Sequence, residues 1–306
     1  ATQRDGLNAY NYNEQTFTAY QHNPENPHSL ITNDVTDIAP STQHDDGLWI
    51  STYYRGIEYL DITSGQFTHY NKNTVPGLPC EQTWTVLDGG DGNLYIGHVG
   101  SGFSILSLKD KSVKNFRNEA GNPMSLPGND VFCIIKDTNG NIWLGTNKGL
   151  ALYNAANENF ITFKKNKNDK YDTLCSRILS IRQLKDNKLW IASELNGIAI
   201  LNLKQSMFLS PEEISLEYIQ EGDDSRGLSN ASARCIFQDS FSCVIFLEIS
   251  CINILCSIHF IYCTGKILNF ILKIILIGRK NLSFFLYSEF SFHRMILIYN
   301  FNDCIT

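Results

Sequence analysis

Three consecutive residues near the start of the chain, Tyr53, Tyr54 and Arg55, place two aromatic rings beside a guanidinium group. A sugar offers hydroxyl groups and weakly apolar ring faces, so its binding site needs an aromatic surface next to planar hydrogen-bonding groups. This short segment supplies both kinds of group. We therefore take Tyr53, Tyr54 and Arg55 as the first candidates for a site that binds an oligosaccharide.

The equivalent segments of later repeats also carry hydrogen-bonding side chains. These are Asn147 and Lys148 in one copy and Glu194 and Asn196 in another. Counting strand directions places all these turns on one side of the fold, where the connectors that carry His28 and Arg177 also lie. Ordinary solvated loops explain each single residue equally well. The hypothesis of a ligand site therefore depends on several turns converging.

The histidines and cysteines do not show the spacing of metal ligands. His22, His28, His44, His69 and His98 are scattered without a His-x-x-x-His or His/Cys cluster, which predicts no metal site. Cys133 and Cys235 occupy the same position of equivalent strands two repeats apart, too distant for the ~4.4 to 6.8 Å that a disulfide requires between Cα atoms. We expect free thiols there, and we predict no catalytic residue and no cofactor.

Imperfect copies of one segment recur along the chain and must position these turns. Asn139 to Leu150 reads as a polar turn, a strand with a tryptophan, a small-residue turn and a second strand. Aromatic anchors recur at spacings of 46, 48 and 47, and a glycine follows each anchor by six or seven residues. The anchors are Trp49, Tyr95, Trp143 and Trp190, and the glycines are Gly56, Gly102, Gly149 and Gly197. A period in the forties with several short strands per copy is typical of a β-propeller.

The predicted fold class is all-β, a partial and open β-propeller of four-stranded antiparallel blades, with about four complete blades. The predicted blades are residues 1–20 (partial), 33–70, 78–116, 126–163, 174–219 and 228–240 (partial). The chain is thus expected to begin inside a blade, with any export signal removed. Four to five blades should form an open arc that leaves an exposed edge on each side.

Residue usage changes abruptly at Phe241. Residues 1–240 carry 20 Lys and Arg against 28 Asp and Glu, and this acidic balance argues against a nucleic-acid partner. From Phe241 onward Ile, Phe, Leu, Ser and Asn dominate, and Ile245 stands where the repeat predicts an aromatic anchor. This usage favours out-of-frame or non-coding translation for residues 241–306, without a packed relation to the blades. A membrane segment over Val244 to Ile277 and a fused domain are the alternatives.

The repeated set of Asn-Asp-Val, Asp-x-x-Gly-Asn, Ile-Trp-Leu-Gly-Thr, Gly-Leu and a closing Phe-x-x-Phe resembles the two-component regulator propeller repeat over residues 1–240. In that family the repeat builds the periplasmic sensor region of hybrid two-component histidine kinases of gut Bacteroidetes. The resemblance implies a periplasmic location and an oligosaccharide from polysaccharide breakdown as ligand. The remaining blades and the downstream modules of a parent receptor are the implied partners, and a homodimer is left open. No kinase His box or nucleotide-binding motif occurs here, so we expect no phosphotransfer by this chain.

Two classes of function follow from these observations. The first is a non-catalytic propeller that senses a ligand. The second is a propeller enzyme such as a glycan lyase or glycosidase, which would need paired carboxylates converging near the propeller axis. Acidic residues cluster in turns rather than at one recurring strand position, which favours the first class. A purely structural or protein-interaction propeller is a further alternative.

Overall fold

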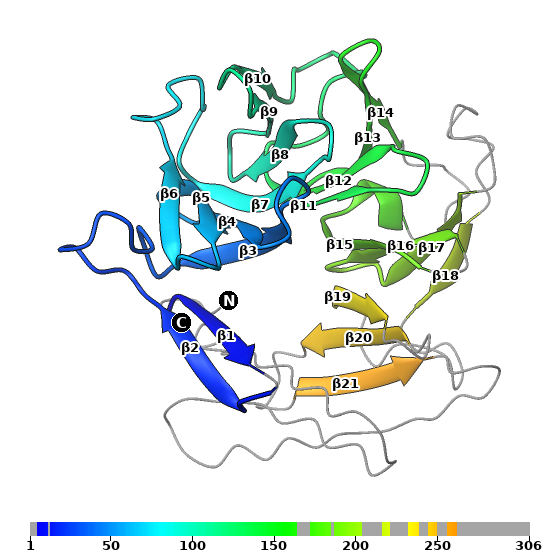
Figure 1. Cartoon of the computed structure of the whole chain (residues 1–306). Coiled ribbons are helices and arrows are strands. Elements are labelled where there is room, and N and C mark those ends of the chain that lie inside the picture. Colours follow the sequence, from blue (N-terminus) through cyan, green and yellow to red (C-terminus); the bar gives the residue numbers. More distant parts are fainter. Residues whose placement is uncertain are drawn as a thin grey trace, which may run out of the picture.

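The computed structural model describes residues 5–11, 13–163, 172–184, 187–203, 216–220, 232–238, 244–249 and 256–261. Within these residues the chain is all-β, apart from a short 3-10 helix at Thr173–Cys175. Its strands form a hairpin, four sheets of four strands and one sheet of three strands. The sheets follow one another around an open arc (Figure 1). The prediction of an open, all-β propeller is therefore confirmed.

We call the sheets blades and number them along the chain after an N-terminal hairpin. The hairpin contains β1 (Leu7–Asn11) and β2 (Thr16–Tyr20). The first blade contains β3 (Val35–Pro40), β4 (Gly47–Thr52), β5 (Gly56–Asp61) and β6 (Gln66–Tyr70), and the second contains β7 (Thr83–Asp88), β8 (Asn93–His98), β9 (Phe103–Ser107) and β10 (Val113–Phe116). The third contains β11 (Val131–Lys136), β12 (Ile142–Thr146), β13 (Gly149–Asn154) and β14 (Asn159–Thr162). The fourth contains β15 (Ile178–Gln183), β16 (Lys188–Ser193), β17 (Ile198–Asn202) and β18 (Leu216–Ile219), and the fifth contains β19 (Ala233–Gln238), β20 (Val244–Ile249) and β21 (Cys256–Ile261).

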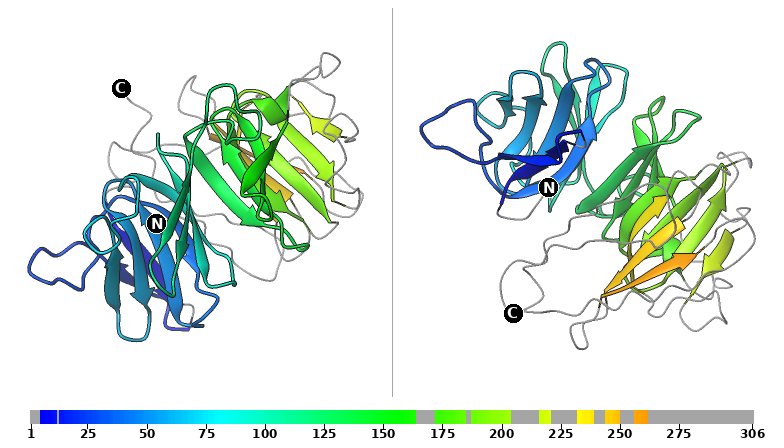
Figure 2. Two further views of the ribbon diagram at one scale, coloured as in Figure 1. Left: turned by 90° about the horizontal axis from the view of Figure 1, so that it is seen from above. Right: turned by 60° about the horizontal axis from the view of Figure 1, so that its bottom comes forward.

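The strands of every blade pair in the order in which they occur in the sequence. The first strand of each blade lies on the inner side of the arc, and each contacts the first strand of the next blade, from β3 through β7, β11 and β15 to β19 (Figure 1). Figure 2 shows the same succession of blades from two further sides. Loops at one end of the blades therefore come from successive repeats and lie next to one another.

The recurring glycines stand at or just before the first residue of the third strand of their blades, where the backbone is left-handed. Gly102 has φ +81°, and a Cβ atom at this position would lie 2.2 Å from the carbonyl oxygen of Phe116. Residues with a side chain rarely adopt such a backbone conformation, and here the contact would also be with rigid backbone. Gly6, which precedes β1, has φ +77° and a similar near contact with the Tyr20 carbonyl oxygen. The spacing of the glycines thus reflects a constraint of the fold itself.

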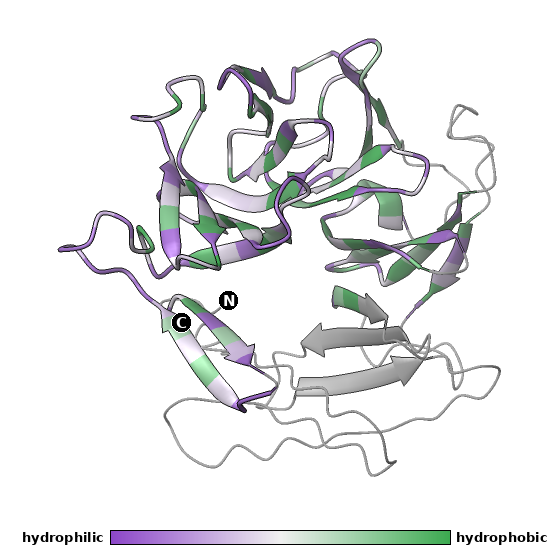
Figure 3. Cartoon of the chain, viewed as in Figure 1, coloured by the Kyte–Doolittle hydropathy of each residue, from purple (hydrophilic) through white to green (hydrophobic). Residues whose placement is uncertain are grey.

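The aromatic anchors fill the interfaces between blades. Trp143 on β12 is completely buried in a cluster with Ile178 and Ile191 of the fourth blade. Trp49 on β4 packs against the second blade, and its indole N–H donates to Asp88 Oδ2 at 3.1 Å. Hydrophobic residues gather along the strands through the middle of the blades (Figure 3). These tryptophans therefore serve packing between blades.

The fifth blade includes strands from beyond residue 240, where the sequence analysis places the end of the repeats. β20 pairs with β19, and Ile245 lies opposite Phe237 at the register position that Trp143 takes opposite Ile135. Strand pairing uses backbone groups, and three of the six residues of β20 are β-branched, which suits a strand even without an aromatic anchor. The expectation that nothing beyond Phe241 joins the blades therefore differs from the structure at β20 and β21. Residues 262–306 lie outside the described part of the chain, so the prediction for them stays a prediction.

Candidate ligand-binding face

The turn between the second and third strands lies beside the residue that enters the first strand in each of the first four blades. One backbone hydrogen bond recurs there, with N···O distances of 3.0 to 3.1 Å. The donor and acceptor pairs are Tyr53 with Asp34, Val99 with Gln82, Asn147 with Asp130, and Glu194 with Arg177. We call this end of the blades the turn face. It carries the turns that the sequence analysis singled out.

The first strand of each blade has a β-bulge near its start. The pairing between the first and second strands skips one residue just after its first pair. The skipped residues are Thr36, Trp84, Phe132, Leu179 and Arg234. A bulge bends the strand locally and re-aims the extra side chain without changing the pairing of the rest of the strand. Three of these bulge residues contact a neighbouring blade at the turn face: Trp84 lies against Tyr53, Phe132 against Arg177, and Arg234 against Glu194.

Four aromatic rings from three blades form a continuous series on this face. The ring centroids of Tyr53 and Tyr54 are 4.3 Å apart, those of Tyr53 and Trp84 are 6.0 Å apart, and those of Trp84 and Phe132 are 5.8 Å apart. Neighbouring rings are nearly perpendicular, an arrangement that the ring quadrupoles favour. Tyr54 is 53% exposed and Trp84 36% exposed, so part of the series is open to solvent. We call these four residues the aromatic belt.

Charged side chains of the fourth and fifth blades continue the aromatic belt. The guanidinium carbon of Arg177 lies 4.4 Å from the ring centroid of Phe132, which is a cation–π contact. Arg177 Nη1 is 3.1 Å from Glu194 Oε2, and Arg234 Nη2 is 3.6 Å from Glu194 Oε1. One carboxylate thus holds two guanidinium groups, and the group keeps a net positive charge. We call Arg177, Glu194 and Arg234 the charged group.

The structure joins three of the seven predicted site residues through these contacts. Tyr53 and Tyr54 begin the aromatic belt, and Glu194 lies at the centre of the charged group. The Asn147 amide instead donates to Asp130 Oδ2 at 2.8 Å and holds its own turn in place. The remaining predicted residues lie on the same turns, where their backbone N–H groups donate to the hydroxyl group of a nearby threonine or serine; these are Arg55, Lys148 and Asn196. The binding role of all seven residues stays a prediction.

Sequence reasoning missed the bulge residues Trp84, Phe132 and Arg234. Each sits inside a predicted blade, where an apolar residue is ordinarily assigned to the core. A signal did exist, because this position carries a different type of residue in every repeat while its neighbours keep their character. Such variation at one position of a repeated frame indicates a side chain that the fold does not need.

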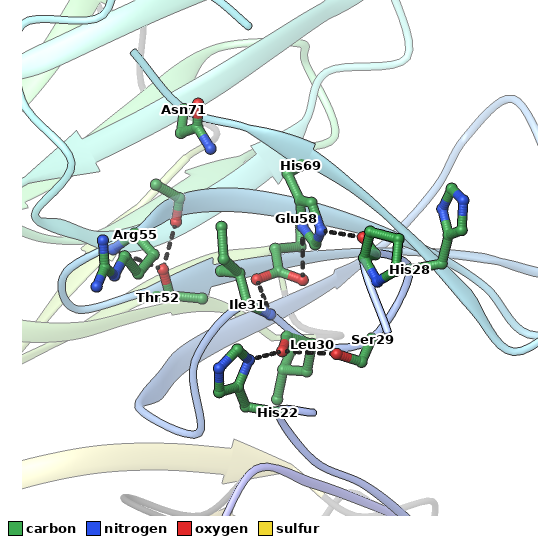
Figure 4. Close-up of polar contacts among 12 residues, drawn as sticks. His22, His28, Ser29, Leu30, Ile31, Thr52, Arg55, Glu58, His69 and Asn71 are labelled. Carbon is green, nitrogen blue, oxygen red and sulfur yellow. Dashed lines mark hydrogen bonds and ion pairs between the residues drawn. The ribbon is translucent and has the colours of Figure 1, made fainter. Parts of the chain in front are cut away.

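A second polar cluster fastens the connector between the hairpin and the first blade (Figure 4). The completely buried Glu58 accepts the backbone N–H of Ile31 at 2.8 Å, and its other oxygen lies 3.5 Å from His69 Nδ1. His69 Nε2 contacts the carbonyl oxygen of Pro27 at 2.8 Å. Burial raises the pKa of the Glu58 carboxyl, and the contact with Glu58 raises the pKa of the His69 imidazole. This cluster holds the loop that leads from the hairpin into the first blade.

In the part of the chain that the structure describes, we find no helix with the length and apolar character needed to cross a membrane.

The known proteins that this chain resembles include bacterial sensor proteins and a histidine kinase. Residues 125–148 match the two component regulator propeller family. The extracellular domain of the hybrid two component system BT3049 from B. thetaiotaomicron is 60% identical, with a TM-score of 0.69, and the match covers 80% of this chain and 30% of that domain. The extracellular domain of the one component system BT4673 from the same organism has a TM-score of 0.60 at 18% identity, over 80% of this chain and 29% of its own, which supports the fold. Histidine kinase P4 of Formosa agariphila is 33% identical over 94 residues, which are 29% of this chain and 7% of the kinase. The chain therefore spans a minor part of these relatives.

Proposed function

Because this chain carries two-component regulator propeller repeats, we propose that it is a non-catalytic, ligand-sensing segment of the extracellular or periplasmic region of a hybrid two-component system. The similarity to a solved extracellular domain of such a system over most of the chain supports this assignment. The partners that follow are further blades of the same propeller and the signalling modules of a parent receptor, with a homodimer as one form of assembly.

We further propose that the ligand is an oligosaccharide that binds on the turn face. The single observation that carries this proposal is the aromatic belt, which runs without a break from Tyr54 to Phe132. Exposed ring surface at Tyr54 and Trp84 can stack on the apolar faces of sugar rings. The charged group beyond Phe132 adds directional donors, and its guanidinium groups suit hydroxyl or carboxylate oxygens of the ligand.

A glycosidase or lyase on the same face has less support. Hydrolysis of a glycosidic bond by the usual mechanism uses two carboxyl groups on either side of the bond. The charged group contains one carboxylate, Glu194, which is already shared between Arg177 and Arg234. An interaction surface for another protein is the second candidate, because exposed tyrosine and tryptophan are also typical of protein interfaces.

The test is a titration of the chain, and of a longer form that includes neighbouring repeats, with oligosaccharides released from plant and host polysaccharides. Calorimetry gives the affinity, and tryptophan fluorescence reports on Trp84. Replacing Trp84 by Ala should weaken binding roughly tenfold, because loss of an aromatic anchor commonly costs more than about 1 kcal/mol. Tyr54→Ala should have a similar but smaller effect.

Met124→Ala is the matched control, because Met124 is 55% exposed and lies on a connector away from the aromatic belt. It should leave the affinity unchanged. If an oligosaccharide binds the wild-type chain, Trp84→Ala and Tyr54→Ala with equal affinity, the aromatic belt is not its binding site. Binding of a protein partner without binding of any oligosaccharide would support the interaction surface instead.

A further inference from the structure

The charged group at the end of the aromatic belt has more hydrogen-bond donors than its one carboxylate can accept. The guanidinium groups of Arg177 and Arg234 together carry roughly ten N–H donors, whereas the Glu194 carboxylate offers roughly four acceptor sites. Each arginine contacts a different oxygen of Glu194, with Arg177 Nη1 at 3.1 Å from Oε2 and Arg234 Nη2 at 3.6 Å from Oε1. Donors that this carboxylate cannot satisfy therefore remain for water or for a further acceptor.

The positive members of the charged group are also the more accessible ones. The side chains of Arg177 and Arg234 are 44% and 43% exposed, and that of Glu194 is 24% exposed. A ligand that approaches from solvent therefore reaches the arginines more easily than the carboxylate. This order of exposure favours a negatively charged ligand group over a positively charged one.

Contacts on several sides hold Arg177 in place before any ligand binds. Its guanidinium carbon lies 4.4 Å from the ring centroid of Phe132, and its backbone carbonyl oxygen accepts the backbone N–H of Glu194 at 3.0 Å. A guanidinium group over a ring keeps its N–H donors in its own plane, where they can form the paired hydrogen bonds that suit a carboxylate. Little side-chain freedom is then lost when an anion binds, which favours affinity.

The two ends of the blades differ in charge. In the first three blades, the end opposite the turn face carries eight acidic residues against three lysines. The acidic residues are Asp45, Asp46, Asp61, Asp88, Asp91, Asp110, Asp137 and Glu158, and the lysines are Lys109, Lys111 and Lys136. The turns and entering residues of the turn face carry, besides the charged group, Arg55, Lys72, Arg117 and Lys148 beside Asp34, Glu81 and Asp130. The excess of acid in these blades therefore lies at the far end, and an anion can approach the turn face.

We propose that the oligosaccharide on the turn face contains a uronic acid whose carboxylate binds Arg177 and Arg234, an inference that rests on the function proposed above. A guanidinium group can donate two parallel N–H bonds to a planar carboxylate, a geometry that a single hydroxyl group cannot match. The uronic acid unit lies at the Phe132 end of the aromatic belt, because the charged group begins there. The other sugar units stack toward the exposed rings of Trp84 and Tyr54.

The test measures, by calorimetry, the binding of uronic acid tetrasaccharides from pectin, alginate and chondroitin to the full chain and to a form extended by the neighbouring repeats. Each tetrasaccharide is compared with its fully methyl-esterified form, which keeps the sugar rings and removes the charge. Neutral tetrasaccharides from cellulose, xylan and mannan complete the series. We expect an acidic tetrasaccharide to bind at least about tenfold more tightly than its ester, because the ester loses charge-assisted hydrogen bonds. Raising the salt concentration should weaken binding of the acid and leave binding of the ester unchanged.

Variants assign the preference to the charged group. Arg234→Gln should remove about tenfold of the preference for the acid over its ester and leave the affinity for the ester unchanged. Tyr54→Ala should weaken both forms in the same proportion, because its ring contacts the uncharged part of the ligand. Lys114→Gln is the matched control, since it also removes one positive charge, from an exposed side chain on β10 that pairs with Glu158. This control should change neither affinity.

The possible results separate this inference from the proposed function. If acid and ester bind equally, or if neutral tetrasaccharides alone bind, the uronic acid is wrong and the ligand is still an oligosaccharide. If no tetrasaccharide of either kind binds, the oligosaccharide itself is wrong, and the uronic acid with it. If the acid is preferred but Arg177→Gln and Arg234→Gln both keep the wild-type preference, the charged group is not the binding site of the carboxylate. The comparison of acid with ester needs no variant and remains decisive if a variant does not fold.

Discussion

The interblade anchor and the bulge residue occupy neighbouring strands of the same blade, yet they vary in opposite ways. The anchor position on the second strand is aromatic in all four complete blades, as Trp49, Tyr95, Trp143 and Trp190. The bulge position on the first strand carries a different residue each time, as Thr36, Trp84, Phe132, Leu179 and Arg234. The anchor must fill an interface between two sheets, whereas the bulge side chains of Trp84, Phe132 and Arg234 contact residues of the turn face. The repeat thus keeps the residue that fills the interface with the next blade and varies the bulge residue, which we propose as part of the ligand site.

Replacing an anchor tests the first half of this comparison and should have the largest effect. Trp143 is completely buried, and its indole N–H donates to Asp137 Oδ2 at 2.9 Å. Trp143→Ala should lower the free energy of unfolding by about 3 to 5 kcal/mol, because it leaves a cavity between two blades. Thermal or urea unfolding measures the change. A loss below about 1 kcal/mol would show that the anchor is not required by the interface.

The glycine at the start of the third strand is, like the anchor, a position that every complete blade keeps. Gly102→Ala should cost about 2 to 3 kcal/mol, because φ is +81° and a Cβ atom would lie 2.2 Å from the Phe116 carbonyl oxygen. Gly100→Ala is the matched control, since Gly100 has φ +74° but no atom within 4 Å of its Cβ position. The control should cost only about 1 to 2 kcal/mol. Equal losses in the two variants would mean that the near contact contributes nothing.

Glu58 is an exception to the rule that buried positions recur from blade to blade. It is completely buried, yet the later blades carry other residues at its place. Ser104, Ala151 and Ala199 stand at its place in the later blades. The pKa values of Glu58 and His69 are raised in the folded chain, from ordinary values of 4.5 and 6.5. The folded chain then binds protons more tightly than the unfolded chain, so stability falls as pH rises through 6.5 toward the raised pKa of His69.

The measurement is the melting temperature as a function of pH above 6.5, where His98, whose pKa is lowered to about 4, no longer changes its charge. Glu58→Gln keeps an oxygen for the Ile31 N–H but removes the carboxylate that raises the pKa of His69. The fall in melting temperature should be shallower in this variant. If the slope of melting temperature against pH is the same in Glu58→Gln as in the wild-type chain, the Glu58–His69 pair does not cause the pH dependence.

Replacing a bulge residue tests the second half of the comparison and should have the smallest effect on stability. Trp84→Ala removes edge-to-face contacts with Tyr53 and Phe132, which are worth about 0.5 to 1.5 kcal/mol each. The same Trp→Ala change should therefore cost far less at position 84 than at position 143, while it weakens oligosaccharide binding. Similar losses of stability at the two positions would erase the distinction between anchor and bulge.

Much of the fold follows from the sequence because its marks arise from strict physical constraints. A glycine is required where the third strand begins, and a large aromatic side chain fills the space between sheets, so both recur at a fixed spacing. The strands beyond residue 240 were not predicted, because β20 lacks the anchor and pairs through backbone groups that any sequence provides.

The candidate site was predicted only in part. Tyr53, Tyr54 and Glu194 lie in turns, where sequence reasoning looks for function, and contacts in the structure connect them. Trp84 and Phe132 were missed because a bulge is a feature of strand pairing and leaves little trace in a single strand. Asn147 was selected for its polar side chain, which in the structure bonds Asp130 within its own blade.

The bulge also bears on how such a receptor could change its preference during evolution. The extra residue sits outside the ladder, so its exchange alters neither the length of the strand nor the alignment of the buried residues. Successive blades thus offer neighbouring positions for substitution, and Trp84 and Phe132 at two of them are in contact. New ligand preferences can arise there by recombining side chains across blades, while the architecture that holds them is inherited intact.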